Sequence, residues 1–175
     1  MKRYGLVLSL LCFLNVAFPD DLPQQFVSKD NHYTINYPTH WRVFPRGQGV
    51  VVFKPKPGAA FLINIQTLLT KEAGGTYPDV KALMDDFYSQ VPKHVDHAHF
   101  MWRKPFTLQQ SAGSLRGEQT LLTFNEAHQT LKQWQVMLVN KNDKVFQAFA
   151  YRAPEGEFDA SQPLAQAMLH SWVIN

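Results

Sequence analysis

The sequence is poor in cysteine: Cys12 is the only one among 175 residues, and it lies near the N-terminus. The segment around it is typical of a secretory signal, because two basic residues precede an apolar run over residues 4–16 and the small residue Ala17 follows. We expect a signal peptide over residues 1–17, cleaved near Ala17. The chain that remains would have no cysteine, which excludes disulfides, thiol catalysis and cysteine-ligated metals.

Long hydrophobic runs are also missing. The apolar run of the leader falls short of the roughly 20 residues that cross a bilayer. We therefore expect no integral membrane span once the leader is removed, and a periplasmic or secreted location. An uncleaved leader that stays as an N-terminal anchor is the alternative.

Dense runs of positive charge are absent as well. The chain has 17 Lys and Arg against 14 Asp and Glu, and the net charge falls from +3 to +1 when the two basic residues of the leader are removed. Nucleic-acid binding needs a basic patch or stripe, so a nucleic acid is not expected as a partner.

Motifs of catalysis and of cofactor binding are not found either. No G-x-S-x-G sequence is present, and Gly74-Gly75 lacks the further residues of a phosphate-binding loop. Asp85 and Asp86 are adjacent, so on a helix they point in different directions. We expect no enzymatic activity and no cofactor.

The chain does contain a series of segments whose apolar residues repeat with the period of a helix or of a strand. After a linker over residues 18–25, one domain is expected over residues 26–175. Its two helices are expected at residues 80–91, with Thr76 as cap, and after Ser161, with Pro163 in the first turn. Extended segments are expected at 32–37, 50–53, 60–69, 94–102, 106–110, 115–124, 131–139 and 145–151.

The connections between the later extended segments are short, as in antiparallel neighbours, since a parallel crossover needs a dozen residues or more. The order of strands, helix, strand meander and helix predicts an α+β fold. We expect a single αβα sandwich with a mostly antiparallel sheet of about six to eight strands and helices packed on it.

One cluster could bind a metal ion. His94, Asp96, His97 and His99 follow the first helix, and imidazoles with a carboxylate suit zinc or copper. On a regular strand, His97 and His99 would share one face and His94 and Asp96 the other. The same residues also fit a solvated polar start of a strand, so both interpretations stay open.

Several motifs together resemble the PsbP/DcrB-like superfamily, over roughly residues 26–174. They are the opening Tyr33-x-Ile35-x-Tyr37-Pro38-x-x-Trp41, the strand 50–53, Ile63-Asn64-Ile65, and the closing segments 146–151 and 164–172. The resemblance implies an αβα sandwich and a scaffold that binds proteins without a common catalytic site. Its known members include a photosystem II subunit, a Ran-binding import factor, bacterial secretion-effector chaperones and DcrB-type envelope proteins, and the leader agrees with an envelope role.

These observations favour a non-enzymatic exported domain that binds an envelope protein partner as an accessory module of an assembly. A metal-binding envelope protein using the cluster over residues 94–99 is the alternative. A hydrolase whose carboxylates or serine meet only in the fold is a further one.

Overall fold

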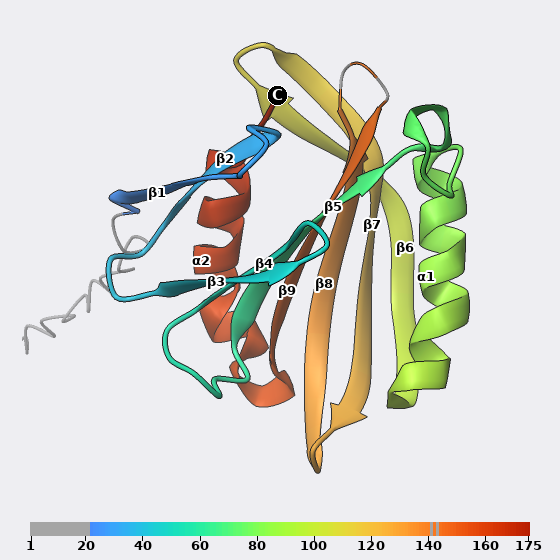
Figure 1. Cartoon of the computed structure of the whole chain (residues 1–175). Coiled ribbons are helices and arrows are strands. Elements are labelled where there is room, and N and C mark those ends of the chain that lie inside the picture. Colours follow the sequence, from blue (N-terminus) through green and yellow to red (C-terminus); the bar gives the residue numbers. More distant parts are fainter. Residues whose placement is uncertain (1–21, 141, 143) are drawn as a thin grey trace, which may run out of the picture.

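The computed structural model describes residues 22–140, 142 and 144–175. Its strands form a large antiparallel sheet of seven, in the order β3-β4-β5-β9-β8-β7-β6, and a small antiparallel sheet of three, in the order β1-β2-β10 (Figure 1). The strands are β1 Gln24–Val27, β2 Tyr33–Tyr37, β3 Arg42–Gly47, β4 Val50–Lys54, β5 Leu62–Leu69, β6 Asp96–Gln110, β7 Gly113–Glu126, β8 Gln129–Val139, β9 Val145–Pro154 and β10 Val173–Ile174.

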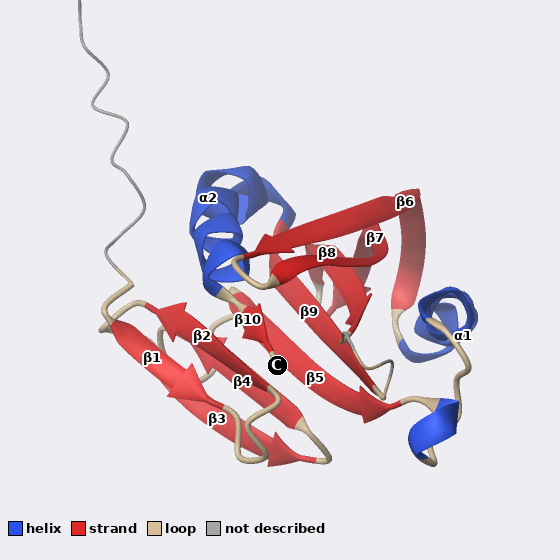
Figure 2. Cartoon of the chain, turned by 90° about the horizontal axis from the view of Figure 1, so that it is seen from above, coloured by secondary structure: helices blue, strands red, loops and turns tan. Residues whose placement is uncertain are grey.

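Two helices cover opposite faces of the large sheet: α1 Val80–His94 on one and α2 Glu155–Ser171 on the other (Figure 2). The short 3-10 helix η1 Lys71–Ala73 precedes α1. The small sheet lies on the α2 side, where Tyr33, Ile35 and Trp172 join the main hydrophobic core. The expected α+β sandwich is therefore confirmed, with seven strands in its main sheet.

The core alternates along the strands in the way that a sheet covered on both faces requires. On β9, Phe149 and Tyr151 pack toward α2 in the main core, whereas Phe146 and Ala148 pack toward α1. Strand β9 is buried from Val145 to Tyr151 because it lies in the middle of the large sheet.

The helix boundaries differ from those expected from sequence. Helix α1 is capped by Asp79, whose Oδ1 accepts a hydrogen bond from the Ala82 amide at 2.7 Å, and Thr76 lies outside the helix. Helix α2 begins at Glu155, so the expected cap Ser161 lies inside it and bonds back to the Glu157 carbonyl. A serine inside a helix can satisfy its hydroxyl on the carbonyl four residues earlier, so α2 accommodates Ser161 in its interior.

The strand pattern also differs at three places. The segments expected at 94–102 and 106–110 are one edge strand, β6, which tolerates Pro105 because an outer edge needs no amide donor there. The pairing of β3 with β4, and the pairing of β2 with β1 and β10 in the small sheet, are not predicted from sequence alone. Strand β1 begins at Gln24, two residues inside the expected linker. The expected signal peptide 1–17 and the first part of that linker lie outside the described residues.

Candidate functional site

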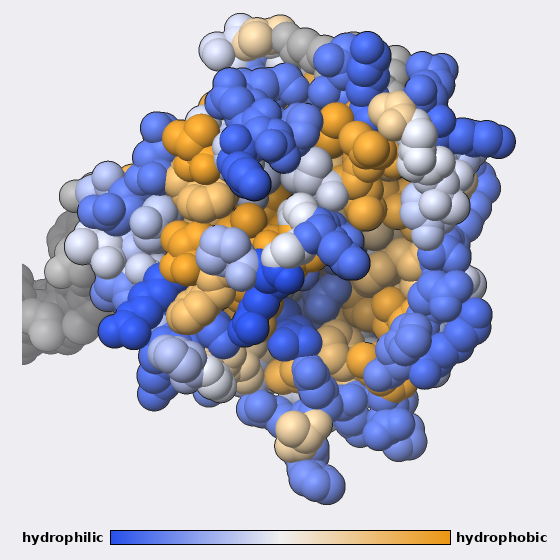
Figure 3. All heavy atoms as spheres, viewed as in Figure 1, coloured by the Kyte–Doolittle hydropathy of each residue, from blue (hydrophilic) through white to orange (hydrophobic). Residues whose placement is uncertain are grey.

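A groove of about 480 Å³ lies between α1 and the part of the large sheet that α1 leaves open. Its floor is formed by β5, β9 and β8, and one wall by α1. Figure 3 shows the surface hollowed next to α1, where hydrophobic side chains border a hydrophilic floor. We take this groove, called the amide groove below, as the candidate functional site.

The strand register fixes which side chains meet on the floor. Ala150 of β9 is paired with Asn64 of β5 on one side and with Gln135 of β8 on the other. Ala148 likewise lies between Gln66 and Met137. Two alanines in line are thus flanked by amide side chains, with Met137 as the apolar exception.

The small size of the two alanines creates the hollow. Ala148 and Ala150 point toward the α1 side of the sheet, and the next residue on that face, Phe146, fills the space beneath α1 with Leu83 and Met84. Ala148 and Ala150 are too short to reach the helix, and Arg152 follows them on the same face at the edge of the hollow. The sheet and α1 therefore separate into a furrow along β9.

Polar atoms on the floor are only partly satisfied. Gln133 donates from Nε2 to Oε1 of Gln135 at 3.1 Å, and Gln135 is only 5% exposed. Oδ1 of Asn64 and Nε of Arg152 are buried without a hydrogen-bond partner. Buried polar atoms are normally paired, so two unpaired ones in one groove call for an explanation.

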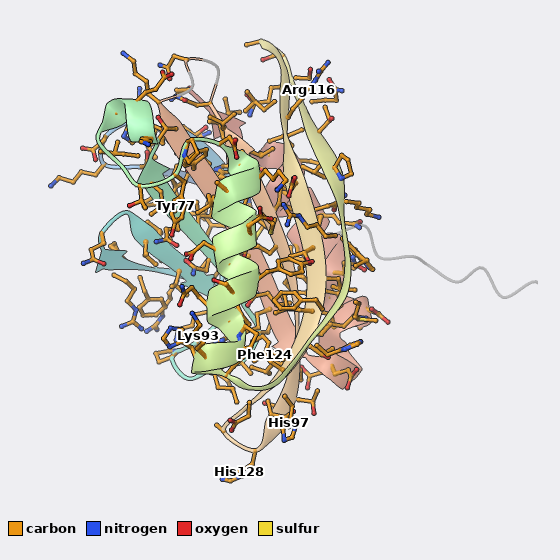
Figure 4. All side chains as sticks on the ribbon, turned by 90° about the vertical axis from the view of Figure 1, so that its right-hand side faces the viewer. Tyr77, Lys93, His97, Arg116, Phe124 and His128 are labelled. Carbon is orange, nitrogen blue, oxygen red and sulfur yellow. The ribbon has the colours of Figure 1, made fainter. Side chains whose placement is uncertain are left out.

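The two charged groups in the lining are already engaged. Arg152 donates to Glu126 Oε2 at 2.7 Å. On α1, Asp86 accepts hydrogen bonds from the Tyr77 hydroxyl at 2.6 Å and from Gln90 at 3.1 Å. The bond from Tyr77, followed by that from Gln90, lowers the pKa of Asp86, and the same contact raises the pKa of Tyr77. Figure 4 shows Tyr77 beside the upper part of α1, on the groove side.

The lining consists mainly of amide and apolar side chains. In the described part of the chain, no serine, cysteine, histidine or lysine lines the amide groove. Among the described residues of its lining, the one carboxylate, Asp86, and the one phenol, Tyr77, are hydrogen-bonded to each other. It presents amide groups, each of which both donates and accepts hydrogen bonds.

The residues expected as possible metal ligands lie elsewhere. His94 ends α1, and Asp96, His97 and His99 start β6, all four of them exposed. The register with β7 shifts between Asp96 and His99, and His97 has a φ of 53°, so the simple alternation that would align His97 with His99 does not hold.

Figure 4 shows His97 at the lower end of the molecule near His128, away from Tyr77. Among the described residues, no three His, Cys, Asp or Glu side chains are placed to hold a metal ion. Metal binding at residues 94–99 stays a prediction that none of these contacts tests.

Sequence reasoning missed the amide groove because its members come from three separate strands. The signal was present in part: Asn64 and Gln66 alternate with apolar residues, as do Gln133 and Gln135, and Ala148 and Ala150 interrupt a run of bulky residues. Alternation assigns each set to one face of its strand. Alternation does not reveal that β9 lies between β5 and β8 in the sheet. Only this strand order places amide side chains on both sides of the alanines.

Solved structures share this fold at low sequence identity. Cyanobacterial PsbP from Synechocystis sp. PCC 6803 has a TM-score of 0.63 and 13% identity, with 87% of this chain and 92% of that chain covered. LpqN of Mycobacterium tuberculosis, described as involved in cell envelope biogenesis, has a TM-score of 0.57 and 15% identity, with 87% and 91% covered. The Ran-binding protein Mog1p of Saccharomyces cerevisiae has a TM-score of 0.53 and 12% identity, with 86% and 94% covered.

The chain therefore shares the fold of cyanobacterial PsbP, LpqN and Mog1p, the fold that its sequence motifs predicted. No protein-family model matches the sequence, and a search of curated proteins found no match. Within residues 22–140, 142 and 144–175, neither helix has the length and apolar character needed to cross a bilayer.

Proposed function

We propose that this protein is an exported, non-enzymatic module that docks on another protein of the cell envelope, and that the amide groove holds its partner. The single observation that carries the proposal is the floor of this groove, where Asn64 and Gln135 flank Ala150. A hollow lined mainly by amide and apolar side chains, whose carboxylate, Asp86, is already hydrogen-bonded by Tyr77, suits recognition.

The fold supports a binding role by analogy. Mog1p is a Ran-binding protein, and LpqN takes part in cell envelope biogenesis. Fold alone does not define function, so the argument depends on the groove. The leader expected over residues 1–17 supports an envelope location for the partner.

Site-directed photo-crosslinking tests the docking. A photoreactive phenylalanine analogue at Gln133, on the groove floor, is compared with the same analogue at Arg116, an exposed position on β7 that Figure 4 places at the upper end of the molecule. In cells of the source organism, an adduct with an envelope protein is expected from position 133 only. Equal adducts from both positions, or none from position 133, would contradict the proposal.

Cell fractionation tests the export. The full chain is expected in the periplasmic or secreted fraction, shortened by about 17 residues in its mature form. A variant without residues 1–17 is expected in the cytoplasm. Finding the full chain in the cytoplasm at its full mass would overturn this part of the proposal and leave the groove to be explained by a cytoplasmic partner.

A further inference from the structure

We infer that the amide groove binds its partner as a linear, uncharged peptide in extended conformation, laid along the furrow over Ala148 and Ala150. This inference rests on the proposed docking function and specifies the chemistry of the partner. Four features of the groove carry it: its width, the spacing of its amides, its charge and the size of its floor residues.

The width follows from the order of the strands. Strands β5 and β8 are the two neighbours of β9. Adjacent strands lie about 4.8 Å apart, so the amide rows of β5 and β8 stand about 9.5 Å apart across the alanines. That gap admits one extended chain, whose backbone then has an amide row on each side.

The spacing along the furrow also matches a peptide. Residues on one face of a strand repeat about every 6.7 Å, and an extended peptide repeats its backbone groups with the same period. Asn64 and Gln66 on one side and Gln133 and Gln135 on the other present both donors and acceptors. A peptide backbone supplies N–H and C=O groups alternately and can satisfy both kinds.

Charge and size narrow the peptide further. Arg152 is already paired with Glu126, and Asp86 is already hydrogen-bonded by Tyr77 and Gln90, so a charged side chain would have to displace an existing partner. The space over Ala148 and Ala150 has to hold the peptide backbone itself, so small side chains suit the inward positions of the peptide. Apolar side chains of intermediate size can pack on Leu62 of β5 and Phe87 of α1 at the margins.

The probe for the test is a phage-displayed library of random linear decapeptides selected on the purified protein. Enriched peptides are expected to be uncharged and rich in small residues. They should shift the NMR signals of side-chain amides on the groove floor. Their affinity should fall at least 20-fold in Ala150→Trp, which fills the furrow, and should be unchanged in Arg116→Trp.

A second pair of variants guards against misfolding of Ala150→Trp. Asn64→Leu and Gln135→Met remove amides without adding bulk, and each is expected to weaken the selected peptides about tenfold. Peptides that bind Ala150→Trp, Asn64→Leu and Gln135→Met as well as wild type would overturn the inference. The inference would also be overturned if no peptide were enriched over a blank support. It would likewise be overturned if the oligosaccharide chitotetraose shifted the NMR signals of the same side-chain amides and no peptide did.

These outcomes are separable from failure of the proposed function. A crosslink at position 133 without peptide enrichment would refute the inference that the partner binds as an extended peptide, while the proposal that the groove docks a partner would stand. Peptide enrichment without any crosslink in cells would refute the proposal of an envelope partner, while the inference that the groove binds an extended peptide would stand.

Discussion

Tyr88 of α1 stacks on Phe100 of β6, with ring centroids 3.8 Å apart and ring planes 14° from parallel. The Tyr88 hydroxyl lies 2.6 Å from Oγ1 of Thr120, which itself donates to the Trp102 carbonyl at 2.7 Å. One side chain thus joins α1 to β6 by ring packing and to β7 by a hydrogen bond. Because α1 is a wall of the amide groove, this contact also fixes the position of the groove.

Substitutions at Tyr88 separate the two contributions. Tyr88→Phe keeps the ring and loses the hydroxyl's short hydrogen bond with Thr120 and its longer one, at 3.4 Å, to the Trp102 carbonyl. This change is expected to lower the free energy of unfolding by about 1 kcal/mol. Tyr88→Ala also loses the ring packing and is expected to cost about 3 kcal/mol. Urea denaturation measures both. Equal losses in the two variants would show that the stacked ring contributes nothing.

The cap of α1 gives a second prediction. Asp79→Ala removes the acceptor for the Ala82 amide and is expected to destabilise the protein by about 1 kcal/mol. Asp79→Asn keeps a capping oxygen and should restore most of that loss. Thr76→Ala, at the cap expected from sequence, should change stability by less than about 0.5 kcal/mol. A larger effect at Thr76 than at Asp79 would contradict the observed start of the helix.

A third prediction concerns the ion pairs between α1 and the sheet. Arg103 of β6 binds Glu118 of β7 and Asp85 of α1 and is only 25% exposed, whereas Lys81 binds Asp85 and is 72% exposed. Arg103→Met leaves two carboxylates without their shared partner, and we expect a loss of about 1–2 kcal/mol. Lys81→Met should cost less than about 0.5 kcal/mol, because solvent screens an exposed pair. Chemical denaturation at 0.1 M salt compares the two, and equal losses would show that Arg103 gains nothing from its burial.

Alkaline pH gives a fourth prediction, through Tyr151. Burial raises the pKa of Tyr151 from 10.0 to about 12, and burial raises the pKa of Tyr33 as well. Between about pH 10 and pH 12 the unfolded chain loses these protons while the folded protein keeps them. The stability they confer is therefore complete below pH 10 and is lost as the pH rises toward 12.

Thermal unfolding between pH 8 and pH 12 checks this dependence. Tyr151→Phe loses the hydrogen bond from its hydroxyl to the Phe158 carbonyl and should melt lower at pH 8. Its melting temperature should then fall less steeply above pH 10 than that of the wild type. Parallel curves for the two proteins would rule out Tyr151 as a source of the alkaline loss.

The sequence predicts the elements of this fold better than their edges. The spacing of Val80, Leu83 and Met84 places one face of α1 in the core, and the structure buries all three. The cap is misassigned because Thr76 and Asp79 are both good capping residues, and only the path of the chain after η1 decides between them. The strand 32–37 is recognised from alternation, but its partners β1 and β10 are too short to be recognised by pattern.

The amide groove is harder still to predict. Alternation places Asn64 on one face of β5 and Gln135 on one face of β8, residues that are 71 positions apart in the chain. Their convergence depends on β9 lying between them, a matter of sheet order that tertiary packing decides. A sequence shows candidate polar faces, and only the pairing of strands shows which of them form a site.

Asn64 allows a final prediction that links stability to function. Its Oδ1 is buried without a partner, so the side chain bears a desolvation cost that no hydrogen bond offsets. Asn64→Leu removes that cost and should stabilise the protein by about 1 kcal/mol, which raises the melting temperature by about 2–4 °C in a domain of this size.

The Asn64→Leu variant should also bind selected peptides about tenfold more weakly. Val173→Leu, at an exposed position on β10 outside the groove, is the control for added apolar volume and should not weaken peptide binding. A lower melting temperature in Asn64→Leu would mean that the amide contributes to the fold. A gain in stability with a loss of binding would instead identify Asn64 as a residue kept for its ligand, since functional sites commonly retain groups that the fold alone would not favour.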